Sequence, residues 1–278
     1  VDMCYICISP VCYLGKHESD CKSNSGSFSL WLNVLTLIFA VPLIIEQVLI
    51  LGPAVSPLMT EGGQFSYDIF VAAVMWAWII GIPLSAICGP ACTAMHYVVL
   101  KMVREEDSYV TKSFFKSFKE NFKQGIILQV IKFFVGGMLI LDFLILRSRG
   151  GLYRYVVFAM FVFLYMVGLY IFPLLSKFEN TVVKTVKNAF ILTIVALPRS
   201  LGMAFVSLLP LLLAYFFDMK FIPIYVLVGI AGPAYLCAML YNPTFKRFEP
   251  QEDEVSEEEE MNAAIRKLDD LDEEKKGE

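Results

Sequence analysis

Four cysteines and a histidine near the amino terminus are the residues with the clearest potential for metal chemistry. Cys4 and Cys7 have the spacing of one zinc knuckle, and Cys12, His17 and Cys21 follow. Tetrahedral zinc takes four thiolate and imidazole ligands of this kind. Most such modules have two paired knuckles, whereas this segment has one. We therefore expect a reduced, poorly ordered leader without a metal site, and a zinc site is the alternative interpretation.

Ionisable side chains inside apolar segments are a second source of chemistry, because a charge at the centre of a bilayer costs about 2.5–3.5 kcal/mol. Glu46 lies within the first apolar segment and has no evident local partner, so it is a candidate functional residue. Lys132 lies seven residues from one end of its segment, where its long side chain can reach the interface. His96 lies five residues before Lys101, near the same surface. These positions argue against a proton relay at the centre of the membrane.

The catalytic motifs of soluble enzymes are absent from the sequence. It has no Gly-x4-Gly-Lys-Ser/Thr phosphate loop, so the chain is not itself an ATPase. It also lacks the Gly-x-Ser-x-Gly and His-Glu-x-x-His motifs. Only two histidines are present, which argues against a histidine-based active site. We predict no catalytic residue, no cofactor, no metal and no nucleic-acid partner.

The elements that must position these residues are membrane spans. Residues 69–100 contain no Lys, Arg, Asp or Glu. As one helix they would be about 48 Å long, against a hydrocarbon core of about 30 Å. Gly81, Pro83, Gly89 and Pro90 lie within this segment and predict a bend or break. Gly89 and Pro90 are candidate functional residues, because broken helices line the binding sites of many transporters.

The composition predicts an all-α polytopic membrane protein. Hydrophobic residues make up 57% of the chain and charged residues 18%, against about 25% in soluble domains. Apolar length predicts about six transmembrane helices, at residues 30–51, 69–100, 125–146, 156–175, 199–217 and 221–240. Thirteen Lys and Arg residues lie on the side with both termini and four on the other side. The positive-inside rule therefore places both termini in the cytoplasm.

The charges divide the chain into three parts. Residues 249–278 hold 14 of the 27 acidic residues and 4 of the 23 basic ones. We interpret this segment as an acidic, mostly disordered tail with one marginal helix. Residues 30–248 form the predicted transmembrane domain, and residues 1–29 form the Cys-rich leader. The body of the chain is thus basic although the whole chain is acidic.

Two basic connections are predicted to be amphipathic helices at the cytoplasmic membrane surface. In residues 109–123 four lysines recur at spacings of 4, 3 and 4, beside a face of three phenylalanines. A second, less polarised copy over residues 180–196 corresponds to the first at an offset of 68 residues. The pattern indicates a helix-then-span unit that occurs twice, although chance matches in an apolar chain also explain it. The candidate functional lysines of the two segments are Lys116, Lys119, Lys184 and Lys187.

Several segments resemble the YesL family of bacterial membrane proteins over roughly residues 67–248. The matching segments are residues 89–98, 101–106, 114–124, 172–181 and 197–199. Members of this family have no established biochemical activity and are often encoded beside carbohydrate-uptake systems. The resemblance implies a multi-pass protein of the bacterial cytoplasmic membrane with a role accessory to sugar import. The Cys-rich leader and residues 30–51 lie outside the resemblance.

One segment bears on how such a protein could act. Glu179 and Pro198 have the spacing of the helix with which permease subunits of ABC importers dock into their ATPase. Thr185 stands where that pattern has glycine, so we favour an amphipathic helix in which Pro198 and Arg199 open the next span. We expect a non-catalytic accessory of an ABC-type carbohydrate importer, in contact with the lipid bilayer and with importer subunits. A permease-like subunit or a stand-alone transporter of small molecules is the alternative.

Overall fold

The computed structural model describes residues 25–58, 60, 63–106, 109–146, 151–216 and 229–249. The candidate zinc ligands and the predicted acidic tail beyond Glu249 lie outside these residues. The described part of the chain contains helices and no strand, which confirms the all-α class. Residues Val1–Tyr241 form one compact unit, and Asn242–Glu278 form a second.

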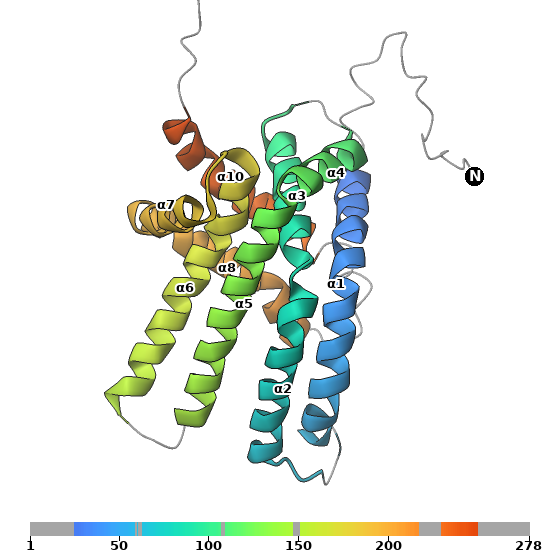
Figure 1. Cartoon of the computed structure of the whole chain (residues 1–278), viewed down its shortest axis with the longest axis vertical. Coiled ribbons are helices and arrows are strands. Elements are labelled where there is room, and N and C mark those ends of the chain that lie inside the picture. The colour runs from blue at the N-terminus through green and yellow to red at the C-terminus, as the bar shows by residue number, and fades with distance from the viewer. Residues whose placement is uncertain are drawn as a thin grey trace, which may run out of the picture. The chain divides into compact units, whose positions relative to one another are not determined.

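Nine α-helices and one short 3₁₀ turn are present among the described residues (Figure 1). In chain order they are α1 (Ser25–Val55), η2 (Ser56–Leu58), α2 (Tyr67–Ser85), α3 (Cys88–Val103), α4 (Val110–Glu120), α5 (Phe122–Ile145), α6 (Leu152–Lys177), α7 (Val182–Val195), α8 (Leu197–Phe216) and α10 (Ala231–Phe248).

Four described helices are long and apolar enough to cross a membrane, namely α1, α2, α5 and α6. Helices α7 and α8 pass the same test together, bent by 102° at Ala196, as a broken span or a re-entrant loop. These helices indicate a membrane protein, with four or five candidate spans in its described part. The expected span at residues 199–217 corresponds to α8, and only residues 229–240 of the expected sixth span are described. The count of six spans stays a prediction.

The overlong apolar segment is broken as predicted. Helix α2 ends at Ser85 and α3 begins at Cys88, with Ala86 and Ile87 in a turn between them. Pro83 lies in the last turn of α2 and lacks a backbone donor, so it weakens the helix there. Pro90 lies in the first turn of α3, where a missing N–H costs nothing.

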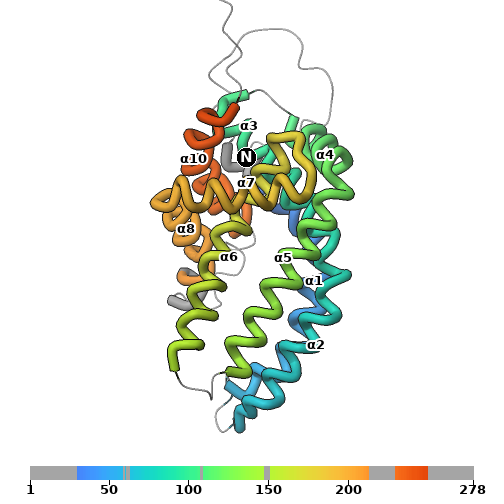
Figure 2. The backbone as a smooth tube through the Cα atoms, turned by 60° about the vertical axis from the view of Figure 1, so that its left-hand side comes forward, coloured from blue at the N-terminus to red at the C-terminus, as the bar shows by residue number. Residues whose placement is uncertain are grey.

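The long helices alternate in direction (Figures 1 and 2). Trp31 Nε1 near the start of α1 donates to Thr111 Oγ1 of α4 at 2.9 Å. The start of α1 and helix α4 therefore lie at the same end of the helical bundle. The Tyr67 hydroxyl at the start of α2 donates to Leu144 O near the end of α5 at 2.6 Å, which fixes the opposite end. Asn33 Oδ1 of α1 accepts from Ala231 N at the start of α10 at 2.7 Å. This bond joins two segments that lie far apart in the sequence.

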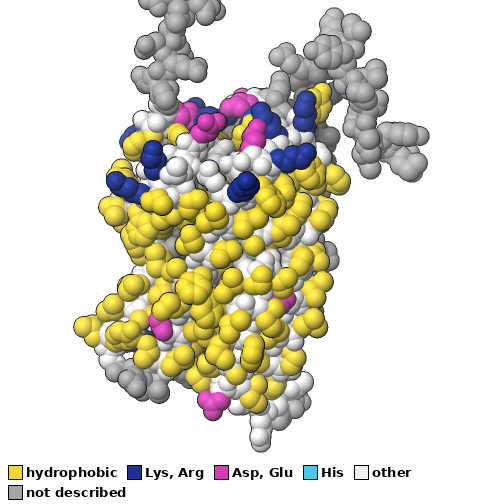
Figure 3. All heavy atoms as spheres, viewed as in Figure 1, with side chains coloured by type: hydrophobic (Ala, Val, Ile, Leu, Met, Phe, Trp, Pro, Cys, Tyr) yellow, Lys and Arg dark blue, Asp and Glu magenta, His cyan; other side chains and the backbone are white. Residues whose placement is uncertain are grey.

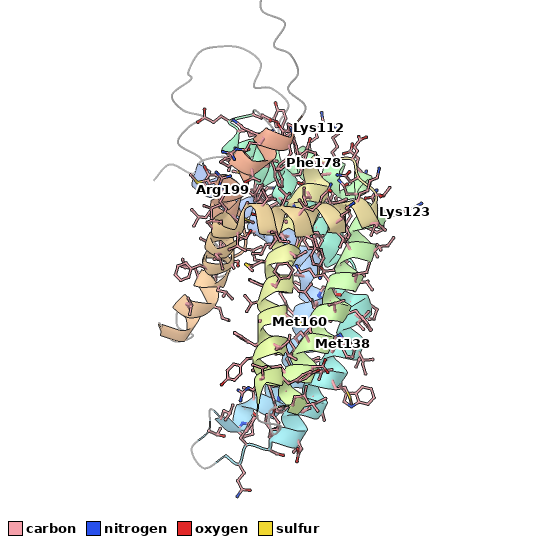
Figure 4. The ribbon with its side chains drawn as sticks, turned by 90° about the vertical axis from the view of Figure 1, so that its left-hand side faces the viewer. Lys112, Lys123, Met138, Met160, Phe178 and Arg199 are labelled. Atoms are coloured by element: carbon pink, nitrogen blue, oxygen red, sulfur yellow. The ribbon has the colours of Figure 1, made fainter. Side chains whose placement is uncertain are left out.

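The surface of the long helices is apolar, and basic residues gather at one end (Figure 3). Large hydrophobic side chains point outward, such as Leu49 with 68% of its surface exposed and Ile69 with 63%. Exposed apolar surface of this extent is unfavourable in water and favourable in lipid. Lys112, Lys123 and Arg199 lie at the end where α4 and α7 are found, away from Met138 and Met160 (Figure 4).

Candidate functional site

Helix α4 has one buried aromatic face and one exposed basic face. Phe114 is fully buried, and the ring of Phe118 stacks on that of Phe39 of α1 with centroids 4.7 Å apart. Helix α4 also packs against α3. Lys116 and Lys119 point away from this contact and are exposed. The predicted amphipathic helix is therefore present, and its position on a membrane surface stays a prediction.

Helix α7 buries small residues instead of aromatic ones. Thr185 and Ala189 are fully buried where α7 packs against α6. The Thr185 hydroxyl donates to Thr181 O at 3.1 Å, one turn earlier. Lys184 and Lys187 are exposed on the other side. Small side chains let two helices approach closely, as is common between helices in membranes.

The turn between α7 and α8 is held by a buried hydroxyl. Ser200 Oγ lies 3.1 Å from both Thr193 O and Ala196 O, and 3.2 Å from the Tyr170 hydroxyl of α6. Pro198 is exposed, and Arg199 is half-buried. A serine that satisfies carbonyls at a helix break stabilises the bend. The bend at Ala196 is thus built into the packing of α6, α7 and α8.

The residues at the positions of the ATPase-docking pattern lie partly on the surface of the protein and partly in its interior. Glu179 and Pro198 are exposed, whereas Thr185, at the glycine position of that pattern, has no exposed surface. A residue that packs against α6 is not available to a docking partner. The interpretation of α7 as an elbow helix at the membrane surface stays a prediction.

Gly89 and Pro90 lie at a close crossing of α3 and α5. A Cβ atom on Gly125 of α5 would lie 2.8 Å from Pro90 N and 3.0 Å from Pro90 Cα. A Cβ atom on Gly89 would collide with Gly125 O. Real side chains do not reach such distances, so both positions need glycine. This contact gives Gly89 and Pro90 a packing role that the sequence did not reveal.

Glu46 is buried between α1 and α2, with 7% of its surface exposed. The sequence offered no evident partner, but Gln47 Nε2 donates to Glu46 Oε2 at 2.7 Å. The same amide lies 3.3 Å from Ala77 O of α2. Glu46 Oε1 is buried and has no partner among the described residues. Helix α1 extends to Val55, so Glu46 lies about 14 Å from the end of the helix, farther in than a span that ends at residue 51 would place it.

A second polar group has members on three helices, and its lysine is exposed while its cysteine and histidine are half-buried. This Lys132 cluster consists of Cys92 and His96 of α3, Lys132 of α5 and Phe172 of α6. Lys132 Nζ lies 4.8 Å from the centroid of the Phe172 ring, on the side of α5 that is near Cys92 and His96 of α3. His96 Nδ1 is buried without a partner among the described residues.

Lys132 lies ten residues into α5, about 15 Å along the helix, because α5 begins at Phe122 rather than at residue 125. Its side chain passes Gly168 of α6, with Cε 3.4 Å from the position that a Cβ there would take. Phe172 lies one turn nearer to Lys177 at the basic end, so the side chain of Lys132 extends toward that end, and its reach to a membrane interface stays a prediction. The four-residue spacing of Cys92 and His96 was the available sequence signal for the cluster.

An open hollow of about 690 Å³ lies where α4 meets α5. We call residues 118–124 the α4–α5 corner. The side chains that line the hollow combine two ammonium groups, one carboxylate, one amide and two aromatic rings, and belong to Phe118, Lys119, Glu120, Phe122, Lys123 and Gln124. The hollow thus offers cationic and apolar surface side by side.

Comparison with known proteins gives one family. Residues 69–143 match the family described as protein of unknown function, DUF624. The match covers α2, α3, α4 and nearly all of α5, and therefore includes the crossing at Gly89 and Gly125 and the α4–α5 corner. No curated protein and no solved structure matches the chain.

Proposed function

We propose that the chain is a multi-pass protein of the bacterial cytoplasmic membrane, with both termini and the helices α4 and α7 on the cytoplasmic side. The gathering of Lys112, Lys123 and Arg199 at one end supports this orientation (Figure 4). Arg154 is at the opposite end, where its guanidinium carbon lies 5.2 Å from the centroid of the Phe143 ring. An arginine held on an aromatic ring is compatible with the outer interface.

Within that orientation, the chain acts as a non-catalytic accessory of an ABC-type carbohydrate importer. The observation that carries this proposal is the exposure of the lysines of α4 and α7 at one end of the long helices, with the other faces of both helices packed on the protein. Such a surface is free to contact anionic headgroups or an acidic partner surface. The resemblance to the YesL family, whose members are encoded beside sugar-uptake systems, supports the choice of partner.

Affinity purification from the native membrane tests this function. Recovery of the chain with two permease subunits and an ATPase is expected, and the yield of those subunits should fall for the variant Lys116→Glu/Lys184→Glu. Both lysines are exposed, so the variant should fold. Arg154→Glu at the opposite end is the matched control and should keep the partners. Recovery without any importer subunit would contradict the proposal.

The Lys132 cluster favours a second candidate function, a permease-like subunit or a stand-alone transporter of small molecules. An intramembrane cation without an ion-pair partner among the described residues can hold an anionic group of a substrate. The cluster includes α3, whose first residue follows the break in the second span, and broken spans line transport sites.

Two measurements separate this candidate from the accessory role. Recovery with an ATPase alone would favour the permease-like subunit, and solute uptake by the purified chain in liposomes would favour the stand-alone transporter. Lys132→Met should then abolish the uptake, whereas Lys123→Met, outside the cluster, should preserve it. Equal uptake by liposomes with and without the chain would exclude the stand-alone transporter.

A further inference from the structure

The hollow at the α4–α5 corner has two unlike walls. One wall carries Lys119 and Lys123, which are both exposed. The other carries Phe118 and Phe122, whose ring centroids are 5.5 Å apart. Phe118 is held in place by its stacking on Phe39 of α1. The apolar wall is therefore anchored to the long helices, and the cationic wall lines the same hollow.

The mixed lining restricts the chemistry of a ligand. Two ammonium groups attract an anionic group such as a phosphate, and the Phe118 and Phe122 rings favour an apolar chain beside it. Glu120 also lines the hollow, and its carboxylate accepts hydrogen bonds from hydroxyl or ammonium groups. A free phosphate ion would satisfy the lysines but leave the aromatic wall and Glu120 unused.

We propose that this hollow binds one anionic phospholipid with a hydroxyl-bearing headgroup, of the phosphatidylglycerol type. The phosphate lies between Lys119 and Lys123, a headgroup hydroxyl donates to Glu120, and the upper parts of the acyl chains lie against Phe118 and Phe122. This inference rests on the proposed membrane-surface position of α4. It adds a specific lipid site at the start of the span α5.

The hollow lies where α4 meets α5, so a bound lipid would affect the stability of this junction. Asn121 separates α4 from α5, and its side-chain amide donates to Ser117 O at 3.2 Å, while its side-chain oxygen accepts no hydrogen bond from the first turn of α5. The start of α5 therefore has no side-chain cap. A phosphate beside this turn is favoured by the helix dipole as well as by the two lysines. We expect the bound lipid to stabilise the corner against unfolding.

The test uses the full chain, purified in detergent and depleted of lipid, with phosphatidylglycerol, phosphatidylethanolamine, phosphatidic acid and inorganic phosphate as probes. Native mass spectrometry counts bound lipids, and thermal unfolding measures stabilisation. We expect phosphatidylglycerol to bind best and to raise Tm. Phosphatidylethanolamine should bind more weakly, because Lys119 and Lys123 repel its ammonium group. Inorganic phosphate should not compete at equal concentration.

Substitutions at the corner locate the site. Lys119→Gln and Lys123→Gln should each weaken phosphatidylglycerol binding about fivefold, because each basic residue near an anionic surface contributes comparably. The matched control Lys116→Gln removes the same single charge from α4 outside the hollow and should leave the bound count unchanged. Glu120→Gln should reduce the preference for phosphatidylglycerol over phosphatidic acid.

Three results would overturn the proposal. They are equal loss of lipid from the control variant, equal binding of phosphatidylethanolamine, and full competition by inorganic phosphate. The last result would assign the hollow to a free anion. None of these results depends on recovery of an importer, so failure of the lipid site is distinguishable from failure of the accessory function.

Discussion

The α4–α5 corner and the α7–α8 corner, the latter comprising residues 193–200, come from similar stretches of sequence and are built differently. In α4 the buried face is aromatic, with Phe114 enclosed among neighbouring rings. In α7 the buried face is small, with Thr185 and Ala189 against α6. Only the α7–α8 pair is apolar enough to count as a broken span. A shared lysine spacing therefore does not fix the environment of a helix.

The difference follows from what each helix packs against. Helix α4 lies beside α1 and α3, and large rings fill the space between these helices. Helix α7 lies close to α6, and its four buried residues are Thr185, Ala189, Leu192 and Thr193. A fully buried aromatic ring fills the contact of α4, whereas the fully buried residues of α7 are Thr185 and Ala189. We expect opposite responses to changes in side-chain size at the two corners.

The largest effect is expected from removing the aromatic anchor of α4. Phe114→Ala should reduce the free energy of unfolding by about 3–5 kcal/mol, because it opens a cavity at a fully buried position. Thermal unfolding in detergent measures the loss. Phe115→Ala is the control, since Phe115 is 39% exposed and should cost less. Equal losses for the two variants would show that α4 lacks the buried face described here.

The reverse change tests α7. Ala189→Leu should destabilise the chain by about 1–3 kcal/mol, because Ala189 has no exposed surface and the added atoms must displace α6. The same assay applies, with Val183→Leu as the control because Val183 is 76% exposed. An Ala189→Leu variant as stable as this control would contradict the tight packing of α7 against α6 at Ala189.

A smaller loss is expected where α5 crosses α3. Gly125→Ala should cost about 1–2 kcal/mol, because a backbone collision with Pro90 exceeds the gain in helix propensity. Gly136→Ala in the same helix meets nothing within 4 Å and should be neutral or stabilising. Gly202→Ala of α8 meets only Leu240 Cδ1, at 3.5 Å, and should also be tolerated. A loss of Tm for Gly125→Ala alone would show that, among these three glycines, only the one at the crossing of α3 and α5 is tightly packed.

The smallest effect concerns the hydroxyl at the second corner. Ser200→Ala should reduce the free energy of unfolding by about 0.5–1.5 kcal/mol through loss of its buried hydrogen bonds. Ser207→Ala, whose hydroxyl is only part-buried, is a control on α8 and should cost less. An unchanged Tm for Ser200→Ala would mean that small-residue packing alone holds the bend.

Much of the fold was predictable because it depends on local properties of the chain. The length of apolar segments identified the spans that became α1, α5 and α6, to within about five residues at each end. The Gly-Pro pairs located the break between α2 and α3. The amphipathic period of residues 109–123 identified α4. Each of these signals is carried by residues close together in the sequence.

The candidate site was less predictable for a physical reason. Glu46, Gly89 and Pro90 were singled out, but their contacts with Gln47, α2 and Gly125 depend on how the helices cross. His96 and Lys132 were treated as separate residues, and Cys92 was not singled out.

The sequence by itself determined that this chain belongs in a membrane, where its second span breaks and which faces of its helices are basic. The tertiary structure alone decided that Lys132 meets α3 and α6, that Thr185 is buried, and that Gly125 crosses Pro90. Hydropathy and period are properties of one segment. Contacts between segments depend on helix register and crossing, which no single segment encodes.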